Sequence, residues 1–156
     1  MHYDKLVSLL ESQHARFRVI EHPAEGKSDL VAKIRGTAPG QGAKAMLCKS
    51  KDGIGDLVLV ILPGDRKLDF KKVADAFGMK KATLASPDEA MQATGCVIGA
   101  IPPFVADAGL RLVADPELVN AYDEIAFNAG RLDRSMVLNT QDYLRIAQPL
   151  VRSVCS

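Results

Sequence analysis

The sequence predicts a single mixed α/β domain over residues 1–156. Three observations predict this class. The length of 156 residues is typical of one compact domain. The composition, 47% hydrophobic and 25% charged, is that of a folded protein with a substantial core. Helix and strand patterns alternate without regular βαβ spacing and include a hairpin, which argues against a doubly wound parallel sheet.

The first half of the chain carries two helical patterns and a hairpin. Leu6, Leu9 and Leu10 recur at helical spacing, and Ser28 and Gly36 suit a helix N-cap and a C-terminal stop. A glycine-containing turn between two apolar runs predicts the hairpin. The expected elements are a helix over 4–15, a strand over 17–20, a helix from 28 to 36, a loop over 37–42, and strands over 43–49 and 57–62 joined by a turn at 52–56.

The second half is punctuated by clear helix signals. Gly78 ends a basic amphipathic pattern, Ser86 precedes a proline at the first helical position, and Thr140 suits a cap. The expected elements are a helix over 69–77, a short strand over 82–85, a helix from 86 to 95, an apolar loop over 97–104, strands over 110–114, 124–128 and 136–138, and a helix over 141–148.

Charge is unevenly distributed, although the formal net charge is only +1. Residues 26–81 contain 12 Lys/Arg and 6 Asp/Glu, whereas residues 82–133 contain 2 and 8. The small total excludes a uniformly basic nucleic-acid binder. The basic segment suits a phosphate-bearing partner or solvated helix faces that balance across the fold, and charge alone favours the second interpretation.

Cysteine usage and hydropathy indicate the compartment. Cys48, Cys96 and Cys155 are too few and too scattered for a disulfide framework, and they are typical of a reducing environment. No apolar run approaches the roughly 18 residues that span a bilayer. The N-terminus leads into an amphipathic stretch without a signal-peptide pattern. The sequence therefore predicts a cytoplasmic protein with no membrane partner.

Several catalytic and cofactor motifs are missing. All three histidines lie within the first 22 residues and no CxxC occurs, so no metal site is expected. Neither GxSxG nor Walker A is present. Residues 40–45 fit GxGxxA, but they precede a strand, so no dinucleotide or other cofactor is expected. Cys96 paired with a histidine is an alternative nucleophile, although a packed loop thiol is its more ordinary role.

Three segments remain as carriers of function. Lys44 shares one strand face with Met46 and Cys48, so its ammonium either lies desolvated in a cleft or reaches water from a packed stem. The loop 95–104, rich in Gly and Pro, either presents free amides to an oxyanion or is a structural turn. Asn128 ends a strand, where it supplies amide donors or simply stops the strand.

In this order, the segments resemble the YbaK family of aminoacyl-tRNA editing domains, which is akin to the insertion domain of bacterial prolyl-tRNA synthetase. The resemblance spans nearly the whole chain and implies a central mixed sheet, largely antiparallel and barrel-like, flanked by helices. The matching pieces are EHPA at 21–24, KAML at 44–47, LDFKKVA at 68–74, TGCVIG at 94–99, GxxxP at 99–103 and FNAG at 127–130.

The resemblance implies a stand-alone trans-editing deacylase, which hydrolyses the ester between a wrong amino acid and the terminal adenosine of tRNA. Lys44 matches the family's essential lysine, and Gly99 matches the glycine of its GxxxP loop. Lys44 is then expected to hold the 3′-terminal phosphate or ester, and backbone groups at Gly99 to bind the reacting centre. Some members carry an acid where this chain has Ser135, and Asp133 lies near but is not clearly equivalent.

The implied partners are the acceptor end of mischarged tRNA and, in addition, an aminoacyl-tRNA synthetase. The pocket is expected to be small and to accept Ser, Thr or Ala by excluding larger side chains. Expected substrate-binding residues are Ile20, His22, Met46, Ile98, Ala100, Ile101, Pro103, Phe127, Asn128 and Gly130. Candidate contacts to tRNA phosphates are Lys27, Lys33, Arg35, Lys49, Lys51, Lys71, Lys72, Lys80 and Lys81.

Two other functions remain open from the sequence. One is a non-catalytic module that binds a tRNA 3′ end or a synthetase, and the other is a small-ester hydrolase that uses Cys96. The presence of both Lys44 and the GxxxP loop favours the deacylase, because a pure binder needs neither in catalytic geometry.

Overall fold

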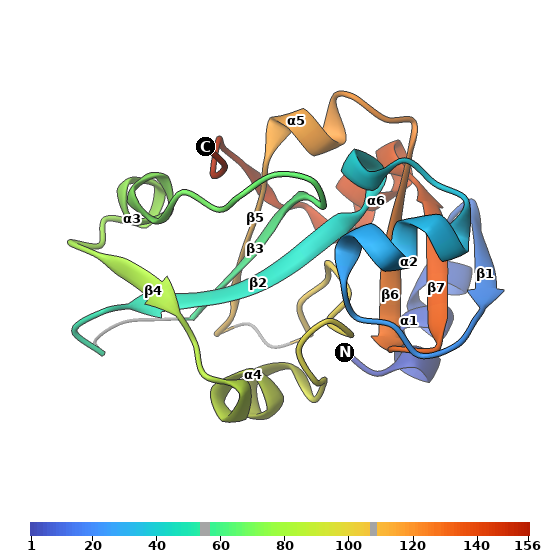
Figure 1. Cartoon of the computed structure of the whole chain (residues 1–156), viewed down its shortest axis with the longest axis horizontal. Coiled ribbons are helices and arrows are strands. Elements are labelled where there is room, and N and C mark those ends of the chain that lie inside the picture. Colours follow the sequence, from blue (N-terminus) through green and yellow to red (C-terminus); the bar gives the residue numbers. More distant parts are fainter. Residues whose placement is uncertain (54–56, 107–108) are drawn as a thin grey trace.

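Two β-sheets and the helices beside them make up the computed structural model, which describes residues 1–53, 57–106 and 109–156 (Figure 1). No helix in these ranges is long and apolar enough to cross a membrane. The elements are α1 (Tyr3–Ser12), β1 (Phe17–Glu21), α2 (Ser28–Arg35), the 3-10 helix η1 (Pro39–Gln41), β2 (Ala43–Ser50), β3 (Val58–Pro63), α3 (Phe70–Phe77), β4 (Ala82–Leu84), α4 (Pro87–Thr94), β5 (Arg111–Ala114), α5 (Pro116–Val119), β6 (Glu124–Arg131), β7 (Arg134–Asn139), α6 (Thr140–Ala147) and β8 (Leu150–Val151).

The strands divide between two sheets. The smaller sheet has the order β1-β7-β6 and is antiparallel. The larger has the order β4-β2-β3-β5-β8, in which β4, β2 and β3 pair antiparallel and β5 and β8 add in parallel. The mixed α/β class is confirmed, but the expected central barrel-like sheet is instead two open sheets. They meet at an isolated parallel bridge between Gly42 and Ala126.

The expected hairpin is present, since β2 pairs antiparallel with β3 and Lys44 lies opposite Leu62. Part of its turn, residues 54–56, lies outside the described residues. Alternate residues of β3 face different layers: Leu59 and Ile61 belong to a core between the two sheets, whereas Val58 and Val60 belong to a second cluster under α3. β3 is therefore buried on both faces, which explains its unbroken apolar sequence.

Helix ends follow the signals in the sequence, with small shifts. Asp69 caps α3 by accepting from the backbone N–H groups of Lys71 and Lys72, and Ser86 caps α4 with a capping box. Ser28 and Thr140 begin their helices instead of capping them, and the caps are Lys27 and Asn139. The sequence analysis missed α5, η1 and β8, which have four, three and two residues and are too short to show a period.

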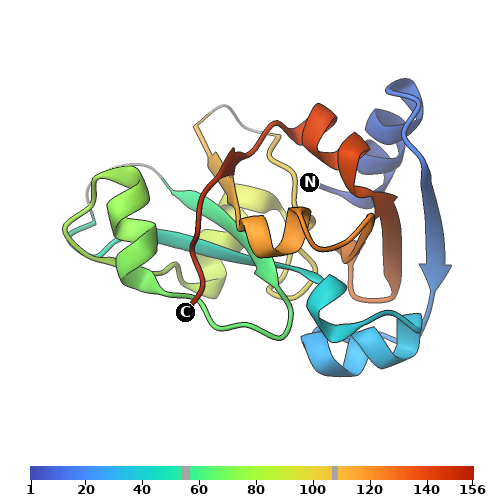
Figure 2. The same cartoon turned by 90° about the horizontal axis from the view of Figure 1, so that it is seen from above.

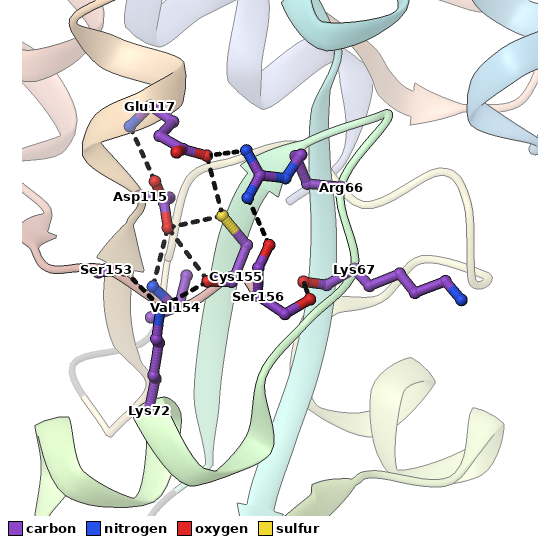
Figure 3. Close-up of polar contacts among 9 residues, drawn as sticks. All are labelled: Arg66, Lys67, Lys72, Asp115, Glu117, Ser153, Val154, Cys155 and Ser156. Carbon is purple, nitrogen blue, oxygen red and sulfur yellow. Dashed lines mark hydrogen bonds and ion pairs between the residues drawn. The ribbon is translucent and has the colours of Figure 1, made fainter.

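The C-terminal segment is fastened beside the larger sheet by Asp115, the buried N-cap of α5. Figure 2 shows this segment passing between α3 and α5, and Figure 3 shows its contacts. Asp115 Oδ2 accepts from the N–H groups of Val154 and Cys155, at 2.8 and 3.2 Å, while Oδ1 accepts from that of Glu117. Burial alone raises the pKa of Asp115, but these hydrogen bonds outweigh burial and hold its pKa below the usual range.

Replacing Asp115 with Ala is expected to lower the free energy of unfolding by about 3 kcal/mol at neutral pH, because buried N–H groups lose their acceptor. Urea unfolding measures the change. The exposed Asp75, in the last turn of α3, is the control, and its replacement with Ala is expected to change stability by less than about 0.5 kcal/mol. Equal stability of the two variants would contradict the role of Asp115. The pKa of Asp115 is lower in the folded state than in the unfolded state. The stabilisation by Asp115 is therefore fully present above the unfolded pKa of about 4, and it is lost as the pH falls through the lower folded-state pKa.

Candidate active site

A small cavity opens where the two sheets meet, between α2, the start of β2, β6 and the loop around Gly99. In Figure 1, α2 and β6 lie at the right. Its volume is about 60 Å³, which is space for about two water molecules or one small side chain. The lining includes the cationic residues Arg35 and Lys44 and, within the described residues, no carboxylate. The lining residues are Gly26, Ser28, Val31, Arg35, Gly42, Ala43, Lys44, Ala45, Gly99, Ile101, Ala126, Phe127 and Asn128.

Helix α2 supplies one wall because Ser28, Val31 and Arg35 are spaced three and four residues apart and therefore share a helix face. Phe127 of β6 forms another part of the lining. Its ring packs against the ring of Phe104 in an edge-to-face arrangement, with the ring centroids 6.1 Å apart. A helix and a strand thus give the cavity rigid walls.

Arg35 is a partly buried cation with no ion-pair partner among the residues that the structure describes. Nε donates to Ser135 Oγ at 2.7 Å and one terminal nitrogen donates to Asn128 Oδ1 at 3.0 Å. Burial lowers the pKa of Arg35 to about 10, so the guanidinium is still charged at neutral pH. A charged group that is held by neutral partners inside a cavity suits an anionic or strongly dipolar ligand.

His22 and Asn128 extend this network beside the cavity. His22 Nε2 lies 2.7 Å from Ser135 Oγ, and Nδ1 lies 2.8 Å from the carbonyl oxygen of Pro23. Ser135 Oγ accepts from Arg35 Nε and lies 3.0 Å from Asn128 Oδ1, to which its hydroxyl donates. These contacts join Arg35, Ser135, Asn128 and His22 into one hydrogen-bonded network.

Lys44 lines the cavity near the start of β2, and its ammonium donates to the carbonyl oxygen of Arg66. Burial lowers the pKa of Lys44, an effect that Asp65 and Cys155 partly oppose. The Arg66 side chain is in turn fixed by Glu117, at 2.5 Å, and by the carbonyl oxygen of Ser156 (Figure 3). The C-terminal segment therefore helps to position Arg66, whose carbonyl oxygen is the hydrogen-bond partner of Lys44.

The loop at Gly99 is shaped by a backbone conformation that favours glycine. Gly99 has φ +91°, and a Cβ there would lie 3.0 Å from Gly26 Cα. Its carbonyl oxygen accepts from Asn128 Nδ2 at 2.8 Å, and its N–H donates to no protein acceptor within the described ranges. Asn128 thus fixes the loop, and Gly99, a residue of the cavity lining, keeps an N–H without a protein acceptor among the described residues.

The structure brings together some of the predicted site residues: Lys44, Gly99, Ile101, Phe127 and Asn128 line the cavity. Arg35, expected as a phosphate contact, is a cavity residue as well.

Other predicted residues do not line the cavity. Met46 packs with the second cluster, because that face of β2 is covered two residues beyond Lys44. The side chain of Ile98 is exposed, and Ile20 is a half-buried residue of β1. Ala100 and Pro103 are buried in the loop, and Gly130 donates its N–H to the Ala100 carbonyl.

The predicted phosphate contacts differ in their surroundings. Lys49 pairs with Glu89 at 2.8 Å, and Lys72 donates to the carbonyl oxygen of Cys155 and to Ser153. Both are partly engaged within the protein. The others are exposed: Lys27 and Lys33 at α2, and Lys51, Lys71, Lys80 and Lys81 at α3 and the neighbouring strands.

Several lining residues were not predicted from the sequence: Gly26, Ser28, Val31, Gly42, Ala43, Ala45 and Ala126. Only Ser28 and Val31 could have been found from the sequence, because their spacing of three and four residues places them on the same face of α2 as Arg35. The small residues of the strands carry no signal of this kind.

The geometry gives no support to Cys96 as a nucleophile. Cys96 is buried against Met1 and Thr94, with no histidine ring in hydrogen-bond contact among the described residues. Asp115, Glu117 and Cys155 lie close enough to ligate a metal, but Asp115 already accepts backbone N–H groups. Burial, then these acids, raise the pKa of the Cys155 thiol to about 12.

The fold and the cavity define a class of protein: a mixed α/β domain with a small cationic pocket and a glycine loop that offers a free backbone donor. Residues 22–146 match the family model described as the aminoacyl-tRNA editing domain. The chain belongs to this family, as the resemblance in its sequence implies.

The chain is 53% identical over 148 residues to the multifunctional Ser/Thr-tRNA deacylase ProXp-y of Escherichia coli (strain K12), with 94% of this chain and 89% of that protein covered. It is 32% identical over 98 residues to a proline–tRNA ligase of Thermosipho africanus (strain TCF52B), with 63% and 15% covered. The crystal structure of a proposed trans-editing enzyme for prolyl-tRNA synthetase has a TM-score of 0.83 at 23% identity, over 99% and 96% of the two chains. That likeness supports the fold.

Proposed function

We propose that this protein is a trans-editing deacylase that hydrolyses the ester bond of serine or threonine attached to the wrong tRNA. The observation that carries the proposal is the cavity in which Lys44, Arg35 and the Gly99 loop converge. The relative that is 53% identical is a Ser/Thr-tRNA deacylase, which supports the substrate class. The partner is the acceptor end of the mischarged tRNA, and a synthetase that releases such tRNA is a second partner.

The reaction needs little from the protein beyond positioning and charge stabilisation. Water attacks the ester carbonyl, and the tetrahedral intermediate then releases the amino acid as a carboxylic acid and the ribose as its 3′-hydroxyl. Lys44 and Arg35 bind the 3′-terminal phosphate or the carbonyl oxygen, and the N–H of Gly99 stabilises the oxyanion. The substrate's own 2′-hydroxyl orients the attacking water, so no protein nucleophile is required.

Size provides the selectivity. A cavity of about 60 Å³ holds the side chain of Ser or Thr and excludes larger ones. Ser28 lies in the lining, where its hydroxyl suits a hydroxylated substrate. Ala would fit by size but would leave this hydroxyl without a partner.

A panel of charged tRNAs tests the function. The wild-type protein is expected to deacylate Ser-tRNA and Thr-tRNA made on noncognate tRNAs and to leave tRNAs that carry larger amino acids intact. The released amino acid is measured against spontaneous hydrolysis in buffer. Failure to accelerate any substrate would leave only a non-catalytic module that binds the tRNA end.

Replacing Cys96 with Ser is expected to change the deacylation rate less than about twofold, since water attacks the ester directly. The measurement is the initial rate on Ser-tRNA, with the folded state of the variant checked by urea unfolding. A folded variant without activity would instead support the small-ester hydrolase that uses Cys96.

A further inference from the structure

A basic groove lies at the other end of β2 from the cavity, between α3 and the β2–β4 pair. α3 and β4 lie together at the left of Figure 1, whereas α2 and β6 lie at the right. The volume of the groove is about 400 Å³. It is lined by Lys51, Phe70, Lys71, Ala74, Lys80, Lys81 and Ala82.

The four lysines of the groove are exposed. None of them forms an ion pair within residues 1–53, 57–106 and 109–156, and no acid is among the lining residues. Asp69, beside the groove residue Phe70, directs its carboxylate to the start of α3, where it accepts backbone N–H groups. The backbones that carry Lys51 and Lys81 are joined by a hydrogen bond of 2.9 Å, which fixes these two positions relative to each other.

The same groove contains an exposed aromatic ring. Phe70 begins α3 and is 37% exposed, although the residues one turn further on, Val73 and Ala74, are buried. Lysines that follow a phosphate backbone, together with a ring that accepts a stacked base, are the combination that binds single-stranded and terminal nucleic acid. An acidic peptide would contact the lysines, but its carboxylates would not stack on the Phe70 ring.

The spacing between groove and cavity suits one extended ligand. β2 runs from Lys44 at the cavity to Ser50 next to the groove, and six residues of strand span about 20 Å. We propose that the groove binds the phosphate backbone of the tRNA acceptor arm while the 3′ ester occupies the cavity, with Phe70 stacked on a base or ribose. This inference rests on the proposed function and adds a second contact region for its substrate.

Two substrates separate groove from cavity: Ser-tRNA, which reaches both, and 3′-O-seryl adenosine, which reaches only the cavity. The variant Lys71→Ala/Lys81→Ala is expected to raise KM for Ser-tRNA about tenfold. It is also expected to flatten the slope of log(kcat/KM) against log[salt] by about 1.4 to 1.8, as each phosphate contact contributes about 0.7 to 0.9. Its kcat/KM for seryl adenosine is expected to stay unchanged.

The matched control is Lys5→Ala/Arg18→Ala, which removes the same charge from exposed positions on α1 and β1. It is expected to keep the wild-type KM and salt slope. Phe70→Leu preserves the apolar volume without the aromatic face, and it is expected to raise KM for Ser-tRNA at least about fivefold. Urea unfolding of each variant separates loss of binding from loss of fold.

The outcomes separate the groove from the cavity. If the groove and control variants change KM for Ser-tRNA equally, or if the groove variant loses activity on seryl adenosine as well, the groove proposal is overturned while the deacylase stands. If the wild-type protein hydrolyses neither substrate, the proposed function fails. Binding of the groove lysines to vesicles of anionic lipid, with unchanged tRNA kinetics, would also overturn the proposal in favour of a membrane surface.

Discussion

Replacing Lys44 with Ala is expected to lower the single-turnover rate of Ser-tRNA deacylation by about 100- to 1000-fold, the cost of removing one preorganised group that stabilises charge. Lys44 and Arg35 are the two cations of the cavity, and no carboxylate lies among the lining residues to offset either. The ammonium donates to the neutral carbonyl oxygen of Arg66, and Asp65 is the acid whose charge acts on it. Because burial lowers the pKa of Lys44, the part of the rate that depends on the ammonium falls at a pH below the ordinary lysine value of 10.5.

The control for this prediction is Lys67→Ala, which removes an exposed lysine from the loop between β3 and α3. It is expected to keep the wild-type rate. Lys44→Arg retains the charge with a different shape and is expected to recover part of the lost rate. A Lys44→Ala variant that is folded and fully active would show that the ammonium takes no part in the reaction.

Replacing Gly99 with Ala is expected to lower the deacylation rate about 100-fold while leaving most of the fold intact. The new Cβ would lie 3.0 Å from Gly26 Cα and 3.2 Å from its carbonyl oxygen, and neither backbone atom can move without displacing the loop. The φ of +91° adds strain. A shift of about 1 Å in the free N–H is enough for a loss of this size. Single-turnover kinetics on Ser-tRNA measure it.

Gly78→Ala is the matched control for Gly99→Ala. Gly78 also has a positive φ, of +68°, but a Cβ there meets no atom within 4 Å, and the residue ends α3 far from the cavity. Gly78→Ala therefore has the backbone strain of a positive φ, as Gly99→Ala does, but not the steric clash with Gly26. If both variants lose the same activity, strain rather than loop placement explains the effect at Gly99.

Local patterns account for the parts of the fold that could be predicted. The β2–β3 hairpin follows from two apolar runs and a turn, and α3 and α4 follow from Asp69, Gly78 and Ser86, all of which act within a few residues. The division into two sheets could not be predicted, because it depends on pairings such as Gly42 with Ala126, far apart in the sequence.

The candidate site was predicted in part for similar reasons. Lys44, Gly99 and Asn128 stand in motifs that can be recognised in a sequence. Arg35 was expected among surface phosphate contacts, since nothing in the sequence shows that the face of α2 carrying it turns into a cavity. Met46 was expected in the pocket because alternation places it with Lys44, whereas the second cluster covers that face.

The most direct test of the cavity as the substrate site is binding of an adenosine that carries serine at its 3′ position through a nonhydrolysable amide. Backbone amide NMR shifts of the protein are recorded during a titration with this analogue. The amide signals of Gly99, Ile101 and Asn128 are expected to move together, and Lys44→Ala is expected to weaken binding. Saturable shifts confined to residues away from α2, the start of β2 and the Gly99 loop, with these three amides unchanged, would contradict the account.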